Sequence, residues 1–176
     1  MARLDGRRSV VSSASGSYNA VRDLLYLEAD LLDRREWSGW ADLYTQDCIY
    51  WVPSWATEDE LTNDPELEVN MIYLTGKPAL EARLYRLTSG QAYATTPLAR
   101  TSHLVNTVRI VEDNGDTIEA SAKWLTLCND PRWGKQIRGG WYDYTLSRVG
   151  DDLKVKQKKI VLLENVIDGA IDIHQI

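Results

Sequence analysis

The sequence predicts an α+β domain in which helices pack on one face of a curved antiparallel sheet. Apolar residues recur every three or four positions through much of the first half of the chain, as in helices. After Arg100 they alternate with polar residues, as in strands. Helices followed by strands, without βαβ alternation, are typical of α+β proteins. The 176 residues suffice for one domain, expected over 17–176 after a flexible tail over 1–16.

Three helices are expected before the main strands. The stripe of apolar residues that begins at Val21 predicts a helix from Ser17, as its N-cap, to about Arg35. The same period continues through Trp37 to Tyr44 and predicts a second, short helix. Pro78 in a first turn predicts a third helix over 77–89.

Between the second and third helices the sequence predicts one strand and one loop. Residues 48–55 are uncharged and rich in β-branched and aromatic side chains, as expected of a short strand. Residues 57–68 are acidic and contain Asn63-Asp64-Pro65, which indicates a loop.

The second half of the chain predicts an antiparallel meander. Asn114-Gly115 lies between two alternating runs, which is a strong hairpin signal. Further strands are expected from about Gln136 to Arg148 and after the turn at Gly150. The apolar residues expected to line the first hairpin are Leu104, Val108, Ile110, Ile118, Ala120, Ala122 and Trp124.

Composition excludes several classes of protein. The net charge is −6 and no block of basic residues occurs, so nucleic acid is not an expected partner. No uncharged run is apolar and long enough to span a bilayer, and the first residues lack the apolar core of a signal peptide. Cys48 and Cys128 lie far apart without a CxxC motif, which fits reduced thiols and a cytoplasmic protein.

Only two histidines are present, and they limit the chemistry. A Rieske cluster needs two cysteines and two histidines in close pairs, but no histidine lies near Cys48 or Cys128. A mononuclear iron triad would consume both His103 and His174. Phosphate-binding glycine loops and the GxSxG nucleophile motif are also absent from the sequence.

A catalytic pocket remains an alternative. Tyr50, His103, Trp124 and Asp143 are the candidates for a dehydratase or isomerase site, although packing in the core and across strands is the favoured explanation for them. The charged side chains of the first helix, including Glu28, are expected on a solvated face or at a subunit contact, and the lysines of the last strand, including Lys158, mostly on an exposed face.

The aromatic residues suggest subunit contacts. Seven Trp and nine Tyr occur with no Phe, and such amphipathic rings suit interfaces. The end of the chain is also apolar, so Ile171 and Ile173 are expected to join an interface, to fold back on the sheet of their own chain, or to do both. The residues expected at contacts are Trp37, Trp40, Trp51, Trp55, Trp141, Ile171 and Ile173.

The order and spacing of several segments over residues 18–176 resemble the small (β) subunit of aromatic-ring-hydroxylating dioxygenases. The ending Ile171-Asp172-Ile173-His174 and the run Trp51-Val52-Pro53-Ser54-Trp55 look most like the benzoate and anthranilate branch, whose substrates are aromatic carboxylates. The other segments that carry the resemblance are Leu24 to Asp33, Leu80 to Leu87, Arg100 to His103, Tyr142 to Tyr144 and Lys158 to Asn165.

This resemblance implies a cystatin-like, NTF2-like cone in an assembly of three large and three small subunits, in which the small subunits form a trimer. It implies that the Rieske [2Fe–2S] cluster and the mononuclear Fe(II) belong to the large subunit. This chain would then hold no cofactor or metal and be structural. The assembled enzyme would form a cis-diol from an arene with O2 and electrons from NADH. A stand-alone dehydratase or isomerase is the competing interpretation.

Overall fold

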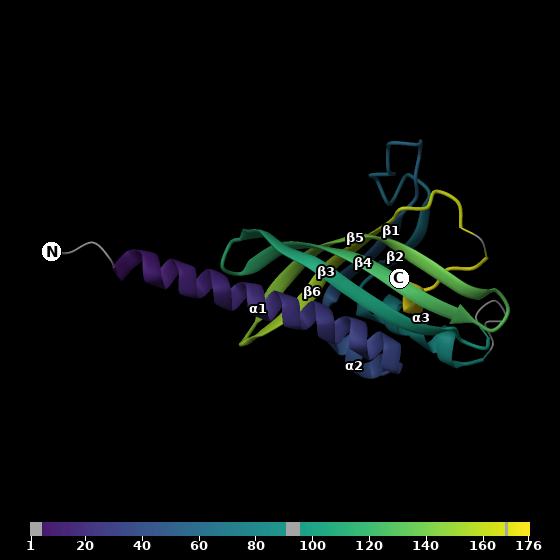
Figure 1. The fold of residues 1–176 in the computed structure, drawn as a ribbon, viewed down its shortest axis with the longest axis horizontal. Helices are drawn as coiled ribbons and strands as arrows, with labels where there is room; N and C mark the ends of the chain where they lie inside the picture. The colour runs from purple at the N-terminus through teal and green to yellow at the C-terminus, as the bar shows by residue number, and fades with distance from the viewer. Residues whose placement is uncertain (1–4, 91–95, 168) are drawn as a thin grey trace.

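A computed structural model describes residues 5–90, 96–167 and 169–176, with side chains described from residue 16 onward. One curved six-stranded sheet in the order β2-β1-β6-β5-β4-β3 forms the body of this part of the chain, with the helices packed against one face (Figure 1). The α+β class predicted from the sequence is therefore confirmed. The elements are α1 Asp5–Arg34, α2 Trp37–Asp42, β1 Tyr44–Pro53, β2 Asn70–Thr75, α3 Lys77–Thr88, β3 Arg100–Asp113, β4 Thr117–Asp130, β5 Gly134–Val149, β6 Asp152–Leu162 and a 3-10 turn Ile173–Gln175.

The sheet is mixed rather than wholly antiparallel. Strand β1 runs antiparallel to β2 but parallel to β6, with Trp51 opposite Lys159. The intervening β2, α3 and meander form the long connection that a parallel pair needs. The expectation of an antiparallel sheet was wrong here, because a strand pattern does not reveal which distant strand becomes its neighbour.

Helix α1 begins well before Ser17. Residues 5–16, expected as a tail, continue the helix, and this stretch contains no proline to end it. The Ser17 hydroxyl does not cap the helix and instead accepts a hydrogen bond from Arg148 Nη2 at 3.1 Å. The expected helix start was therefore wrong, whereas the end at Arg34 agrees with the sequence.

Strand β2 had no signal of its own in the sequence pattern. Its six residues follow the acidic loop and pair with β1, and only Ile72 among them is buried. Strand β1 also starts at Tyr44, within the segment expected to complete the second helix.

Two bulges change the direction of side chains along β3. The register with β4 shifts between Asn106 and Arg109 and again between Ile110 and Glu112, and Thr107 has a φ of 53°. As a result Val108 points inward while Leu104 is 51% exposed on the outer face. Leu104 was thus wrongly expected to share a face with Val108, since an unbroken period of two cannot anticipate a bulge.

The concave face of the sheet and the helices enclose the core. Trp40, Tyr50, Tyr142 and Tyr144 are among its largest fully buried side chains, and Trp124 stacks on Tyr142 with ring centroids 5.2 Å apart. Cys48 and Cys128 are buried free thiols. No helix in the described ranges combines the length and the apolar character needed to cross a membrane.

The last residues fold back on their own chain. Ile173 and Ile176 are fully buried in the core, and Asp172 pairs with Arg83 of α3 at 2.8 Å. The Asp172 carboxylate also accepts from the Ile173 N–H at 2.8 Å, while the Gln175 side chain accepts from the Asp172 N–H at 3.1 Å. The expected fold-back is therefore found, and the complete burial of Ile173 leaves this residue no exposed surface for the interface that was also expected of it.

We expect Ile173→Ala to lower the free energy of unfolding by about 2–5 kcal/mol, because it leaves a cavity in a packed core. Urea unfolding of the full chain measures this change. Ile137→Ala, at a position that is 63% exposed, is the matched control and should change little. Equal effects of the two substitutions would contradict the fold-back of the last residues.

Candidate functional site

A buried ionic cluster lies in the middle of the concave face. Glu28 of α1 accepts hydrogen bonds from the hydroxyls of Tyr44 and Tyr144, the latter at 2.7 Å, and from Lys158 Nζ at 3.0 Å. The Lys158 ammonium also lies 4.1 Å from the ring centroid of Tyr142. Both members of this ion pair are almost completely buried, so it acts in a medium that screens charge weakly.

Burial governs the ionisation of this cluster. It lowers the pKa of Lys158, although Glu28 opposes the change. It raises the pKa of Tyr44 and Tyr144 well above the ordinary value, and the Glu28 charge adds to the effect. The tyrosines therefore remain neutral donors at physiological pH, and the cluster is a satisfied structural element.

Glu28 and Lys158 were wrongly expected on solvated faces, although the sequence carried a signal for each. Lys158 alternates with Ile160 and Leu162, which are both inward-facing, and Glu28 follows Leu24 and Leu25 on the apolar stripe of α1. A charge on each of two apolar faces was therefore a hint of a buried pair.

The four residues proposed for a catalytic pocket do not form one site. Tyr50 lies in the core beside Lys158, whose Nζ is 5.9 Å from the Tyr50 ring. His103 lies on β3, where its Nδ1 is 2.7 Å from Asp33 Oδ1 and its backbone N–H donates to the same carboxylate. Asp143 faces outward on the opposite side of the sheet. Trp124, a fourth candidate, is a core residue stacked on Tyr142.

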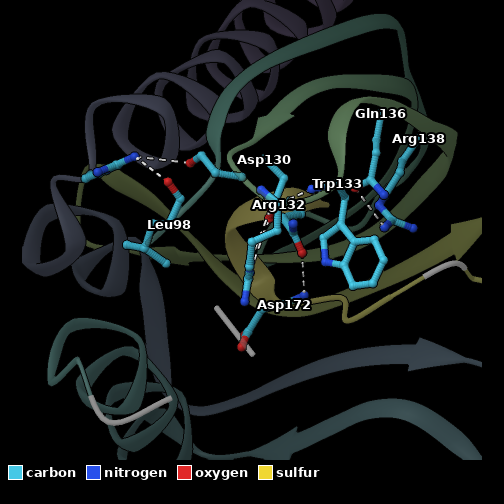
Figure 2. A network of polar contacts seen from close by, with 10 residues as sticks. Leu98, Asp130, Arg132, Trp133, Gln136, Arg138 and Asp172 are labelled. Carbon is cyan, nitrogen blue, oxygen red and sulfur yellow. Dashed lines mark hydrogen bonds and ion pairs between the residues drawn. The ribbon is translucent and has the colours of Figure 1, made fainter. Parts of the chain in front are cut away.

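A second polar region lies on the concave face, where β3, β4 and β5 run side by side. Opposed positions on these strands place His103 beside Thr126 and Thr126 beside Arg138, and each has one buried polar side-chain atom that finds no hydrogen-bond partner in the described part of the chain. Figure 2 shows the surrounding contacts, where Arg138 reaches Gln136 at 3.4 Å and Arg132 pairs with Asp130 at 3.3 Å.

His174 from the last turn joins this region. Its side chain is buried, neither ring nitrogen has a hydrogen-bond partner among the described residues, and burial lowers its pKa to about 4. His174 is therefore neutral at physiological pH. Among the described residues, no group of three histidine, cysteine, aspartate or glutamate side chains is arranged to hold a metal ion.

The outer face of the sheet carries exposed apolar side chains. Its apolar patch, called here the outer patch, consists of neighbouring side chains on β3, β4 and β5 that are 40–63% exposed. An apolar surface of this kind commonly marks a protein contact. The members of the outer patch are Leu104, Leu125, Leu127 and Ile137.

A groove of about 270 Å³ adjoins the outer patch. Lys123 lies over the Trp141 ring at 5.1 Å, and Lys159 of the neighbouring strand faces Asp143 across the β5–β6 pair. Burial raises the pKa of the Asp143 carboxyl, which the two lysines partly counteract. We call this the basic groove; its lining includes Thr107, Arg109, Ser121, Lys123, Trp141 and Asp143.

The tryptophans expected at subunit contacts are divided between the two sides of the sheet. Trp40 is fully buried in the core of its own chain, so its assignment to an interface was wrong. Trp55 and Trp141 meet on the outer side with ring centroids 6.5 Å apart, and the Trp55 Nε1–H donates to the Leu162 carbonyl at 2.9 Å. Trp51 is largely covered there by Lys159, whose Nζ lies 4.5 Å from its ring, and Trp37 packs beside the core.

Comparison with known proteins identifies relatives of this chain. A family model described as ring hydroxylating beta subunit matches residues 27–169. The chain is 31% identical to the toluate 1,2-dioxygenase subunit beta of Pseudomonas putida, over 91% of this chain and 98% of that one. It is 33% identical to the 2-halobenzoate 1,2-dioxygenase small subunit of Burkholderia cepacia, over 94% and 100%. The crystal structure of the beta subunit of benzoate 1,2-dioxygenase from Burkholderia mallei superposes with a TM-score of 0.72 at 31% identity, covering 89% of this chain and 95% of that one.

Lys158→Met should lower the free energy of unfolding by about 3–5 kcal/mol, because Glu28 would be left buried without its counter-ion. Glu28→Gln combined with Lys158→Met should recover part of the loss. Arg34→Met, which breaks an exposed ion pair with Asp30, is the control and should leave stability near that of wild type. Chemical denaturation measures all three. The structural role of the buried pair is wrong if the first variant is as stable as the control.

The lowered pKa of His174 should make the fold sensitive to acid. Between pH 6.5 and about 4 the unfolded chain binds a proton at His174 that the folded chain does not, so stability falls as the pH falls. From pH 7 to pH 4.5, wild type should lose roughly 2–3 kcal/mol more than His174→Gln. Denaturation curves at the two pH values measure the difference. Equal losses in the two proteins would rule out this origin of acid sensitivity.

Proposed function

This chain belongs to the family of ring-hydroxylating beta subunits, and we propose that it is the small, structural subunit of an oxygenase that acts on an aromatic carboxylate. The observation that carries this proposal is similarity over almost the whole length of relatives named for toluate, 2-halobenzoate and benzoate. These compounds are benzoates with different substituents. The shared part of their chemistry, a ring carrying a carboxylate, is therefore the substrate class proposed here.

The arrangement of the concave face supports a structural role. Its centre is occupied by the Glu28–Lys158 pair and its tyrosine partners, all of them buried. The residues of the stand-alone dehydratase or isomerase alternative lie apart, with Asp143 on the other face of the sheet from Tyr50 and His103. Asp143 therefore does not share a face of the sheet with the other two candidates, as an acid and a base acting on one substrate would need to do.

In the proposed oxygenase, the Rieske [2Fe–2S] cluster and the mononuclear Fe(II) reside in the large subunit. The distribution of ligands in this chain supports that division, since Cys48 and Cys128 are separate buried thiols and the sequence has only two histidines. The large subunit would carry out cis-dihydroxylation with O2 and electrons derived from NADH. The small subunit contributes surfaces that hold the assembly together.

We further propose an assembly of three large and three small subunits in the cytoplasm, in which the small subunits form a trimer. The outer patch and the neighbouring aromatic residues are the surfaces proposed for subunit contacts. Exposed apolar side chains beside tryptophan and basic residues are typical of contact centres. The earlier candidates that remain proposed contact residues are Trp37, Trp51, Trp55, Trp141 and Ile171.

Co-expression with a large subunit of this family tests the function. The two chains should co-purify, and the complex should convert benzoate to a cis-diol when supplied with reductase and NADH. The isolated small chain should carry no stoichiometric iron in metal analysis and should turn over no arene. Tightly bound iron in the isolated chain, or failure to associate with any large subunit of the family, would refute the proposal.

His103→Gln separates the two interpretations within the same experiment. In a structural subunit this variant should keep most of the turnover of the complex. A general acid or base contributes typically about 10²–10⁴-fold, so a loss of that size with the assembly intact would favour the pocket-enzyme alternative.

A further inference from the structure

The loop between β1 and β2 is an ordered acidic protrusion. Residues 56–69, called here the acidic loop, project from the sheet on the side away from α1 and α2 (Figure 1). The Ala56 N–H donates to the Glu60 carbonyl at 2.8 Å, and the Glu68 carboxylate accepts from the N–H groups of Asn63 and Asp64 at 2.6 and 2.7 Å. These bonds give the loop a defined shape in the single chain.

The outward side chains of the acidic loop combine charge with apolar surface. Glu58, Asp59, Glu60 and Glu66 are exposed, and no ion pair to any of them is found among the described residues. Two apolar side chains lie beside them, Leu67 with 85% and Val69 with 74% of its surface exposed. Isolated exposed apolar residues are ordinary, but two on an ordered acidic protrusion form a surface suited to docking.

The basic groove has the opposite character. Arg109 and Lys123 line the groove together with one acidic residue, Asp143, and Lys159 lies opposite Asp143 on the neighbouring strand, on a chain whose overall charge is negative. No ion pair of these three cations is found in the described part of the chain either. The groove therefore concentrates positive charge on an otherwise acidic molecule.

The bulged part of β3 lines this groove. Thr107 has a positive φ where the register with β4 shifts, and it forms one wall of the groove. A non-glycine residue in this conformation costs free energy and persists only when its surroundings hold it there. Bulges of this kind commonly redirect side chains at binding surfaces.

We propose that the acidic loop of one copy of this chain docks on the basic groove of a second copy. The carboxylates of the loop would face Arg109 and Lys123, while Leu67 and Val69 would cover apolar surface around Trp141 and Leu125. The two surfaces are thus complementary, because the negative charges of the loop face the positive charges of the groove and apolar side chains of both are covered.

This contact joins two different surfaces, so it is head-to-tail. A head-to-tail contact closes a ring when its rotation divides a full turn evenly, and three copies related by such a rotation make a trimer. The inference rests on the proposed function, from which the trimer of small subunits comes. It adds the surfaces that form the trimer and the origin of its specificity.

Sedimentation of the full chain alone, with paired charge reversals, tests the contact. Arg109→Glu with Lys123→Glu in the groove, and Glu58→Lys with Glu66→Lys in the loop, should each raise the dissociation constant of the trimer by about tenfold or more. All four substitutions together should recover most of the affinity, because the complementarity is restored with opposite signs. Higher salt should weaken the wild-type trimer, since exposed charges are screened.

Arg86→Glu with Lys156→Glu is the matched control for the groove variant. It makes the same change in net charge as that variant, at exposed positions outside both surfaces. It should leave the dissociation constant within about twofold of wild type. Urea unfolding of every variant shows whether its fold is intact. A fourfold variant that regains trimer affinity is itself evidence of an intact fold.

Several outcomes would overturn the docking proposal. They are a wild-type chain that remains monomeric, a groove or loop variant that associates like wild type, or a control that weakens association equally. Co-purification with the large subunit is measured in parallel. A wild-type chain that binds the large subunit while charge reversal has no effect refutes the docking and leaves the proposed function standing, whereas failure to bind refutes the function itself.

Discussion

The structure depends on one constraint, which is that two opposite charges buried between the helices and the concave face of the sheet must pair with each other. Glu28 belongs to the first helix and Lys158 to the last strand, and they meet with the hydroxyls of Tyr44 and Tyr144 at the carboxylate. A buried charge without its partner is costly, so helix, first strand and last two strands must adopt their positions at once. Alternative arrangements that slide α1 along the sheet would leave both ions unpaired. The pair thus selects one packing of the helix rather than adding much net stability.

In the described part of the chain, the two faces of the sheet differ in character. The concave side holds the buried side chains of Trp40 and Tyr142, the ionic cluster and the buried residues of the last turn. The convex side carries the outer patch and the basic groove. A cone with this distribution is suited to holding neighbours in place, which agrees with the family to which it belongs.

Most of the architecture could be predicted from the sequence, because the turn residues and the period of the apolar residues indicate the same elements. Asn114-Gly115 forms the expected hairpin, and α2, α3 and the later strands lie close to their expected positions. What could not be read depends on distant partners. The parallel pairing of β1 with β6 has no local signature, and the bulge at Thr107 interrupts the alternation of apolar and polar residues along β3. Glu28 and Lys158 each lie on an apolar face, which the sequence does show, but the sequence does not show that these two distant charges meet.

The parallel β1–β6 pair also determines when the protein can fold during its synthesis. Strand β1 gains one of its two neighbours from β2 soon after it emerges, but the other is the last strand made, so contacts of long sequence separation must form late. The buried lysine that neutralises Glu28 arrives with that same strand. A nascent chain is therefore expected to stay incompletely folded until β6 has left the ribosome, with the sheet edge at β1 available for wrong pairings. A chain whose last strand is unpaired lacks both the second neighbour of β1 and the counter-ion of Glu28.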